Sequence, residues 1–354
     1  MEYSTNYDIG DRKRGQGINE DSLGLTVFEQ GHREGYAGRE REDGRPQNRS
    51  TGVFVLADGA GGHDAGDAAS YIATTVVTEE LADLAVRAAR SKPDDFDVAI
   101  DEAVLPERPG AGDLQTAVAE AIETAHREII RYAAESGEQA YTTVVAGVAV
   151  GGYLHYGWVG DSRAYVLNEA REELSLLTKD HAVVQEWADA GEVDDVAAHV
   201  HPKGNEITRA LGGSGYEDPE RASVEVETRS VPLYAEDVVL VTSDGLIDAQ
   251  TDAPALYERY VEADRSEEMG EAVLEAVVTD DDIRETLLAA DSLDAAATEF
   301  VDVANERGGK DNLSVLLFRD PALPETPTEG GIPERDIDPD TALEDRETVI
   351  HTDE

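Results

Sequence analysis

The chain of 354 residues contains no cysteine, so disulfide bonds and thiolate metal sites are both excluded. Long apolar runs are missing as well. No stretch is long enough to span a bilayer, and the first residues do not resemble a signal peptide. We therefore expect a cytoplasmic protein that has no membrane partner.

Positive charge is scarce. The 29 lysine and arginine residues stand against 78 aspartate and glutamate residues, which gives a formal net charge of -49. Nucleic acids and anionic membrane surfaces both require positive charge on a protein, so neither is expected as a partner. The acidity has two possible explanations, which are local binding or buffering of cations and adaptation of the whole surface to high salt.

The distribution of the acids favours salt adaptation. They are spread along the entire chain, lysine is rare, and the apolar segments are rich in alanine and valine. High ionic strength screens the repulsion that so many like charges cause. We expect a halophilic source, a halophilic archaeon in particular, and a fold that low salt destabilises.

Apolar runs and helical patterns do not alternate one for one. Runs at 142–150 and 153–159 flank two glycines and predict a tight hairpin, which implies antiparallel pairing. The order of elements favours an antiparallel α+β layered domain over a doubly wound one. Further strands are expected within 1–30 and at 163–167, 174–177, 222–228, 238–242 and 313–318, and helices at 67–90, 113–136, 181–190 and 253–305, the last with breaks near Asp264 and Asp280.

The helix at 113–136 has suitable ends, with Asp113 as N-cap and Gly137 as C-cap. Other segments have little to bury. Residues 31–50 are a polar loop, and 91–112 hold three prolines and many acids, which indicates an acidic surface insertion. Residues 320–354 hold five prolines, many acids and few apolar groups, so a disordered acidic Pro-rich tail is expected.

Aspartates stand at the ends of four apolar runs. Asp58 follows 53–57, Asp161 follows 156–159, Asp244 follows 237–242, and Asp311 precedes 313–318. A lone Asp-Gly step is usually an ordinary turn. Four buried strands with carboxylates at their ends, however, would deliver oxygen ligands to one edge of a core. Hard divalent cations such as Mg²⁺ and Mn²⁺ need such oxygen sites.

Short motifs surround these aspartates. In order they are Gly17-Ile18-Asn19-Glu20-Asp21-Ser22, Ala57-Asp58-Gly59-Ala60-Gly61-Gly62-His63, Thr142-Thr143, Val159-Gly160-Asp161-Ser162-Arg163, Leu177-Thr178-Lys179-Asp180-His181, Ile207-Thr208-Arg209-Ala210-Leu211-Gly212, Thr242-Ser243-Asp244-Gly245-Leu246 and Gly309-Lys310-Asp311-Asn312. Each is weak alone, but the ordered series resembles the metal-dependent protein phosphatase 2C (PPM) family of protein serine/threonine phosphatases. The resemblance covers about residues 5–319.

The resemblance implies both a fold and a domain. The fold is a four-layer α-β-β-α sandwich of two antiparallel sheets flanked by helices, which agrees with the α+β class expected from the residues. The phosphatase domain would span 1–319. Within it, residues 182–215 would form a flap that borders the site and affects substrate choice.

The resemblance also implies a binuclear metal centre. Asp58 would bridge two Mn²⁺ or Mg²⁺ ions, the Gly59 carbonyl would ligate one of them, and Asp244 and Asp311 would complete the second. Two such ions about 4 Å apart share a carboxylate and position a water of lowered pKa, so that hydroxide can attack a phosphate monoester in line. Asp161 would hold a third, weaker ion together with Asp244.

Glu20 and Asp21 resemble the family's first acidic motif. The resemblance favours action on the metals through waters, and direct ligation stays open. A solvated turn is the structural alternative for both residues. Asp21, Glu20 and Asp161 thus complete the expected metal set around Asp58 and Asp244.

Substrate phosphate needs a cation, and the family uses an arginine just before the acidic motif. Arg12, Lys13 and Arg14 form the basic cluster there, and an arginine fork suits phosphate oxygens. Intervening glycines lengthen the spacing, so either Arg12 or Arg14 could fill the role. Arg14 is the preferred candidate and joins Asp58, Asp244 and Asp311 as an expected catalytic residue.

Histidines are not expected to act in the chemistry. His63 belongs to a Gly-Gly-His turn that we interpret as structural, so the leaving group must take its proton from water or another group. His199 and His201 could suggest a metal pair, but the following Pro202 and the loop around them favour the flap over zinc.

The expected function is metal-dependent hydrolysis of phosphoserine and phosphothreonine in proteins that serine/threonine kinases have phosphorylated, by a monomeric catalytic core. One alternative is a phosphatase-like regulatory module that binds a partner without turnover, which the presence of Asp58, Asp244 and Asp311 disfavours. The other is an acidic cation-buffering protein, which the ordered motif series disfavours.

Overall fold

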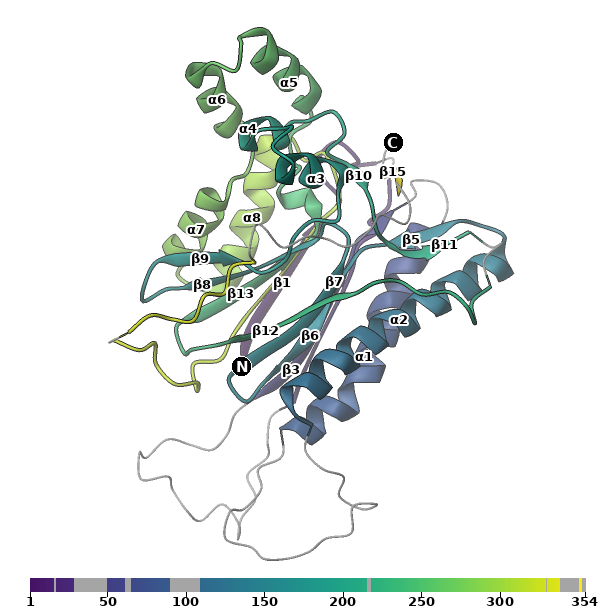
Figure 1. Ribbon diagram of the computed structural model, residues 1–354. Helices are drawn as coiled ribbons and strands as arrows, with labels where there is room; N and C mark the ends of the chain where they lie inside the picture. The colour runs from purple at the N-terminus through teal and green to yellow at the C-terminus, as the bar shows by residue number, and fades with distance from the viewer. Residues whose placement is uncertain are drawn as a thin grey trace, which may run out of the picture.

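Two five-stranded antiparallel sheets face each other in the computed structural model (Figure 1). It describes residues 1–15, 17–28, 50–60, 65–89, 109–214, 218–328, 330–337 and 350–351. The first sheet has the order β1 (Glu2–Asp8), β14 (Leu313–Arg319), β13 (Asp237–Thr242), β8 (Arg163–Asn168) and β9 (Glu173–Leu176). The second has the order β12 (Glu227–Pro232), β7 (Tyr153–Val159), β6 (Val144–Val150), β3 (Thr51–Ala57) and β2 (Ser22–Phe28).

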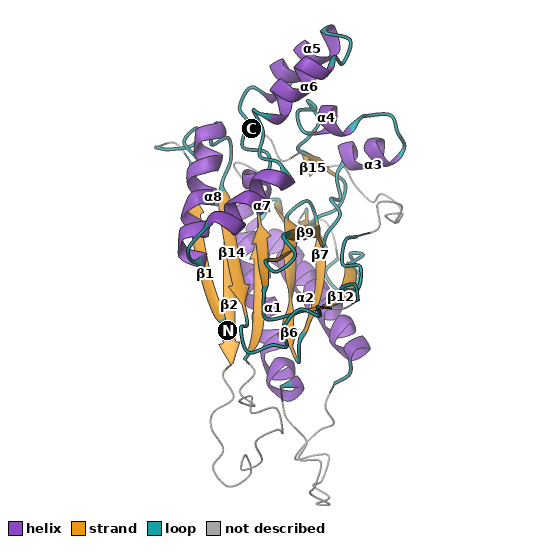
Figure 2. Ribbon diagram, turned by 90° about the vertical axis from the view of Figure 1, so that its left-hand side faces the viewer, coloured by secondary structure: helices purple, strands orange, loops and turns teal. Residues whose placement is uncertain are grey.

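Helices cover both outer faces of this pair of sheets, as Figure 2 shows from the side. The expected four-layer α-β-β-α sandwich is confirmed. The second sheet is covered by α1 (Gly66–Ala88) and α2 (Ala111–Ser136), and the first by α7 (Asp280–Ala289) and α8 (Leu293–Arg307). Within the described residues, no helix is long and apolar enough to cross a membrane.

Smaller elements lie around one end of the sheets. Three short strands, β4 (Gly59–Ala60), β5 (Ala140–Thr142) and β11 (Leu211–Gly213), form one small sheet, and β10 (Glu206–Ile207) pairs with β15 (Ile350–His351). The helices there are α3 (Val183–Asp189), α4 (Asp195–Ala198), α5 (Ala253–Glu262) and α6 (Glu267–Leu274), and the 3-10 turn η1 covers Asp244–Leu246.

The apolar runs are strands because alternate residues face two different apolar layers. In β3, Val53 and Val55 pack under α1 and α2, whereas Phe54 and Leu56 pack between the sheets. Strands buried on both faces read as continuous apolar runs rather than as alternating ones. This is why 53–57 and 313–318 carry so little polarity.

Predictions that depend on one turn or one helix end are confirmed. The hairpin of β6 and β7 pairs Val150 with Tyr153, as its glycine turn predicted. Gly137 closes α2 with a left-handed φ of 81°, as a C-cap does. The helical region 253–305 breaks before Asp264 and at Asp280 as expected, with a further break between α7 and α8.

Other predictions differ from the structure. The N-cap of α2 is Gly110 rather than Asp113, because Asp113 lies in the first turn and its side chain accepts from the Gly110 N–H at 2.8 Å. The helix therefore begins inside the predicted insertion 91–112, of which 91–108 lie outside the described residues. Residues 31–49 and His63 also lie outside them.

The predicted strand 222–228 is wrong in its bounds. Only the last two of its residues belong to β12, where Glu227 pairs with Trp158. Val224 and Val226 lie before β12. Both side chains pack into the apolar layer under α1 and α2 without strand pairing.

The expected disordered tail, 320–354, differs from the structure over 320–328 and 330–337, whereas 338–349 and 352–354 lie outside the described residues. Residues 320–328 and 330–337, which we call the strap, lie across β8, β9, β12 and β13. Arg335 forms a buried ion pair with Asp237 at 3.0 Å, and the backbone N–H of Ile337 donates to the Leu176 carbonyl at 3.0 Å. Arg229 donates to the carbonyl of Arg335 at 3.1 Å. Composition predicted disorder because the strap docks through few apolar side chains.

Arg335→Met tests how much the strap stabilises the sandwich. Asp237 keeps its bonds from Asn168 (2.7 Å) and from the Tyr234 N–H (2.7 Å), but its charge loses the buried partner. We expect the free energy of unfolding to fall by about 3 to 5 kcal/mol, because breaking a buried pair leaves an uncompensated charge. Urea titration in molar KCl measures it.

The control for this prediction is Arg171→Met. Arg171 is exposed and donates to the carbonyls of Pro327 and Gly330 in the same strap. Arg171→Met should lower the free energy of unfolding much less than Arg335→Met, since substitutions of exposed residues change stability little. Equal losses in the two variants would show that the buried pair has no special role.

Candidate active site

Five aspartates from both sheets meet at one end of the sandwich. Asp58, Asp161 and Asp244 follow the last residues of β3, β7 and β13, whereas Asp21 directly precedes β2 and Asp311 lies two residues before β14. The antiparallel registers Ser22 to Ala57 and Thr242 to Val315 bring these opposite strand ends to one edge. We call the five residues the carboxylate cluster.

Hydroxyl groups join the two sheets beneath the carboxylate cluster. Ser243 donates from Oγ to Asp21 Oδ2 at 2.8 Å and accepts from the Ser314 N–H at 2.9 Å. The carbonyl of Asp58 accepts from the N–H of Thr143 at 2.8 Å and from Oγ1 of Thr142 at 2.7 Å. The acids are therefore fixed by neighbouring strands rather than by their own loops.

Burial and mutual repulsion weaken the acidity of Asp21, Asp58 and Asp244. Burial first, and then the charges of neighbouring aspartates, raises the pKa of Asp58 and of Asp244 well above the ordinary 3.8. Burial chiefly raises the pKa of Asp21 to about 6. The charges of Asp21 and Asp244 both act on Asp58. A cation among these groups would relieve the repulsion.

Asp161 is almost fully buried. Burial, followed by the charge of Asp180, raises its pKa to about 7. Arg163 holds Asp180 with three hydrogen bonds between 2.7 and 3.1 Å, so that arginine is already paired. Asp161 therefore faces Asp244 with its charge largely uncompensated.

Two glycines allow the backbone to close around the carboxylates. A Cβ on Gly59 would lie 2.4 Å from the Gly66 carbonyl oxygen, and one on Gly245 would lie 1.9 Å from the Asn312 carbonyl oxygen. Neither position can carry a side chain without moving a neighbouring strand or helix. The Asp-Gly pairs at 58 and 244 are thus explained by close packing as well as by chemistry.

The donor set fits hard divalent cations. Oδ1 of Asp21 and Oδ1 of Asp244 are buried and have no hydrogen-bond partner, and an orphaned buried oxygen demands an explanation such as an ion. The aspartates of the cluster offer carboxylate oxygens, the ligands that Mg²⁺ and Mn²⁺ prefer. Within the described residues, no three acids or histidines already stand as a finished metal cage. The fit therefore rests on the orphaned oxygens and the donor chemistry.

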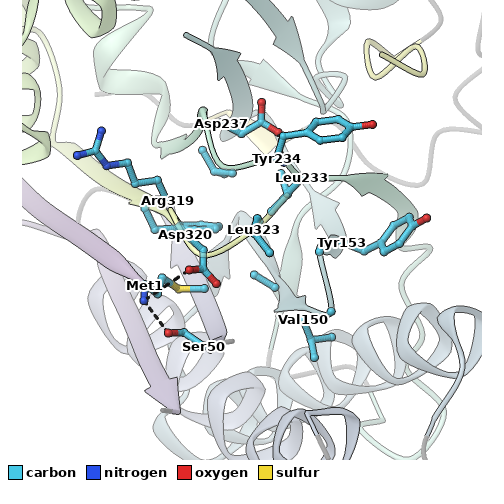
Figure 3. A pocket seen from close by; sticks show the side chains of 15 residues that line it. Met1, Ser50, Val150, Tyr153, Leu233, Tyr234, Asp237, Arg319, Asp320 and Leu323 are labelled. Atoms are coloured by element: carbon cyan, nitrogen blue, oxygen red, sulfur yellow. Dashed lines mark hydrogen bonds and ion pairs between the residues drawn. The ribbon is translucent and has the colours of Figure 1, made fainter. Parts of the chain in front are cut away.

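The cavity in Figure 3 lies at the opposite end of the same strands. It is lined by Ser50 before β3, Asp237 at the start of β13 and Phe318 near the end of β14. Its free space of about 10 Å³ holds about one water molecule. The Met1 ammonium donates to Ser50 at 2.6 Å and lies 4.0 Å from Asp320. Packing fills this end, and no phosphate ester fits there.

A family model for protein phosphatase 2C matches residues 43–290, well over half of the 354 residues. The chain belongs to the protein phosphatase 2C family. As a member of this family, it is a protein serine/threonine phosphatase.

Relatives agree in sequence and in fold. The serine/threonine phosphatase stp of Listeria monocytogenes is 29% identical over 280 residues, which are 78% of this chain and 86% of that protein. The crystal structure of the Mycobacterium tuberculosis serine/threonine phosphatase PstP/Ppp gives a TM-score of 0.55 at 26% identity, covering 89% of this chain and 97% of that chain. A structure of the PstP catalytic domain in complex with 2 manganese ions gives a TM-score of 0.53 at 26% identity, covering 89% and 96%.

The basic cluster of the phosphatase is arranged differently from the prediction. Arg14 is exposed and pairs with Asp8 at 3.0 Å and Asp11 at 2.9 Å, away from the carboxylate cluster. Arg12 is exposed as well. Lys13 is partly buried and pairs with Asp311. Although burial opposes it, attraction by Asp311 and then by Asp244 raises the pKa of Lys13.

Sequence reasoning missed Lys13 because the three cations are adjacent and the turn decides which one points inward. Gly10 and Gly15 both have left-handed φ angles, 82° and 81°, on either side of this turn. The Arg12 N–H also donates to the Gly309 carbonyl at 3.0 Å. The glycine turn and these contacts with 309–311 orient Lys13 toward the site. The sequence near residue 13 gives no indication of contacts with residues so far along the chain.

Glu20 and the histidines also have defined places. Glu20 is partly buried, which raises its pKa, and its N–H donates to Asn312 Oδ1 at 2.9 Å. Asn312 thus links the acidic motif to β14, a role that sequence reasoning did not assign. His201 packs between the rings of Trp187 and Tyr257 with centroids 5.2 and 4.8 Å away. That packing supports the interpretation as a flap residue over a zinc ligand.

The raised pKa values predict a pH dependence of stability in the presence of chelator. The native state holds protons on Asp21 and Asp161 that the unfolded chain releases above the ordinary value of 3.8. Their contribution to stability is therefore lost as pH rises from about 4 through 6 to 7. Asp161→Asn should flatten this fall by more than about 1 kcal/mol, one pKa step being worth about that much.

Thermal unfolding between pH 4 and pH 8 measures that slope. Asp302→Asn is the matched control, because Asp302 is an exposed acid on α8 and should leave the slope unchanged. Identical slopes in wild type and Asp161→Asn would contradict the uncompensated burial of Asp161.

Proposed function

We propose that this phosphatase hydrolyses phosphoserine and phosphothreonine in proteins at a centre for two divalent cations. Asp58, the Gly59 carbonyl, Asp244 and Asp311 would hold the ions, with Asp161 and Asp244 for a third. The observation that carries this proposal is the pair of buried, unpartnered oxygens on Asp21 and Asp244 within a set of aspartates that are buried or partly buried.

When bound, such cations act as Lewis acids and provide a water nucleophile at neutral pH for in-line attack on phosphorus. The residues of the chain perform the positioning. Ser243 orients Asp21, and Thr142 and Thr143 fix the Asp58 backbone. Glu20 lies beside Asp21 and is proposed to act through water. A rigid frame of this kind is what electrostatic catalysis requires.

Manganese is supported by the PstP catalytic domain, whose structure is a complex with 2 manganese ions. The oxygen donors accept magnesium as well. The substrates are proposed to be products of serine/threonine kinases, and the catalytic core is proposed to be monomeric. Because the net charge of -49 predicts instability at low salt, the assays below are set in molar KCl.

We assign the contact with substrate phosphate to Lys13 rather than to Arg14. The Lys13 ammonium lies at the carboxylate cluster, whereas the Arg14 guanidinium is committed to Asp8 and Asp11. An ammonium is a compact donor that binds phosphate as a point charge. In this proposal the basic cluster at 12–14 still provides a cation for the substrate phosphate, but that cation is Lys13 rather than the predicted Arg14.

Asp244→Asn tests the metal centre. Turnover of p-nitrophenyl phosphate with Mn²⁺ should fall at least about 100-fold, because a neutral amide binds the cation poorly and Lewis-acid stabilisation is worth several kcal/mol. Circular dichroism verifies the fold, and Asp302→Asn controls for the loss of one negative charge. Retained turnover in folded Asp244→Asn would refute the ligand role.

Lys13→Met tests the phosphate contact at saturating Mn²⁺. The Michaelis constant should rise about tenfold, as expected for the loss of a hydrogen bond to a charged group. Arg14→Met is the matched control and should leave both kinetic constants near wild type. The reverse pattern, with Arg14→Met alone raising the Michaelis constant, would restore the original assignment.

A further inference from the structure

The few lysines of this acidic chain are concentrated at the site and the flap. The sequence has five, at positions 13, 92, 179, 203 and 310, and all but Lys92 are described. Lys13 reaches the carboxylate cluster. Lys179 is buried and pairs with Asp189 at the end of α3 at 2.7 Å, and Lys203 pairs with Glu206 inside the flap at 2.8 Å. Lys310 joins the flap to the site.

Lys310 contacts two separate parts of the molecule. Its ammonium donates to Asn205 Oδ1 in the flap at 2.9 Å and to Asp248 Oδ2 at 2.6 Å. Its backbone N–H donates to the Ala249 carbonyl at 3.1 Å. A lysine ammonium has three donors and can serve two acceptors at once. One partly buried side chain thus bridges the flap and the segment that follows η1.

Both loops beneath this bridge carry proposed metal ligands. Lys310 directly precedes Asp311, and the N–H of Asp248 donates to the carbonyl of Asp244 at 2.7 Å. A displacement of Lys310 is therefore coupled to the position of the flap and to the backbone of both ligand loops. The flap, with α3, α4 and β10, lies over the end of the sheets that holds the carboxylate cluster (Figure 1).

Asn205 lies in a short turn of the flap. The Gly204 N–H donates to His201 at 2.9 Å, and the Glu206 N–H donates to Lys203 at 3.1 Å. The adjoining strand β10 has only two residues. Local structure of this size orders a turn weakly. A hydrogen bond from the core to Asn205 therefore contributes substantially to its position.

We propose that Lys310 is a positioning residue that latches the flap to the Asp311 loop, and that this latch determines how tightly a phosphoprotein segment binds. The proposal rests on the proposed active site. A small aryl phosphate reaches the carboxylate cluster without extending onto the flap. A peptide continues past the phosphorylated residue and meets the flap, and an unlatched flap must be ordered at each binding event, which lowers affinity.

Asn205→Ala is the primary variant because it removes the flap side of the latch and leaves the Lys310–Asp248 pair intact. The Michaelis constant for a phosphothreonine peptide should rise about tenfold, the scale of one hydrogen bond to a charged group. The constants for p-nitrophenyl phosphate should stay within about twofold of wild type, since no flap contact is lost there. Lys310→Met should show the same effect on the peptide.

The double variant should be no worse for the peptide than the poorer single variant, because both remove the same contact. Lys203→Met is the matched control. It removes an exposed lysine pair two residues from Asn205 and should leave the peptide constant unchanged. If Asn205→Ala raised the Michaelis constant equally for the peptide and the aryl phosphate, the proposal would be overturned. The substitution would then act on the site that both substrates share and not on the flap.

Hydrogen exchange provides a readout that does not depend on activity. The amides of 201–207 should exchange about tenfold faster in Asn205→Ala and Lys310→Met, and at the wild-type rate in Lys203→Met. If wild type hydrolysed neither substrate, the proposed function would fail, and exchange alone would decide the latch. Unchanged exchange in both latch variants would overturn the latch whatever the activity.

Discussion

Mutual repulsion among closely placed carboxylates is the constraint on which the rest of this structure depends. Five aspartates share one edge of two sheets, where Asp161 is buried and the other four are partly buried, so that less solvent screens their charges. Such an arrangement persists only if the backbone is over-determined and cations are present. Seryl and threonyl hydroxyls provide the first condition. Lys13 contributes to the second, and the proposed divalent ions would complete it, so the fold and the proposed chemistry depend on the same repulsion.

The order of the strands explains why the cluster could be read from the sequence. Asp58 and Asp244 each follow an apolar run that fills a strand from end to end, so their position at a sheet edge is a local property. Antiparallel pairing then brings the N-terminal end of β14, with Asp311, to that edge. Which cation faces the cluster is not local. Contacts across some 300 residues select Lys13 over its two neighbours.

Amino-acid composition did not predict the docking of the strap, because that docking depends on a few specific contacts. The strap is acidic and rich in proline, yet it buries Arg335 against Asp237 and places Ile337 in the apolar layer between the sheets. Four of its other bonds run from Arg171 and Arg229 to main-chain carbonyls, which any sequence offers. The predicted strand 222–228 shows the same limit, because Val224 packs against the helices without strand pairing. A buried valine occurs in both environments, so its presence does not distinguish them.

The division of labour between the two basic residue types follows from their chemistry. Arg163 grips Asp180 with a fork of hydrogen bonds, whereas Lys13 and Lys310 each place a single compact charge among several oxygens. Molar salt screens exposed pairs within a few ångströms but affects partly buried ones much less. Lys13 and Lys310 are only partly exposed, so added salt weakens their contacts less than it weakens exposed pairs. The contacts that hold the proposed site and the flap are therefore less sensitive to ionic strength than the acidic surface of this chain, whose net charge is -49.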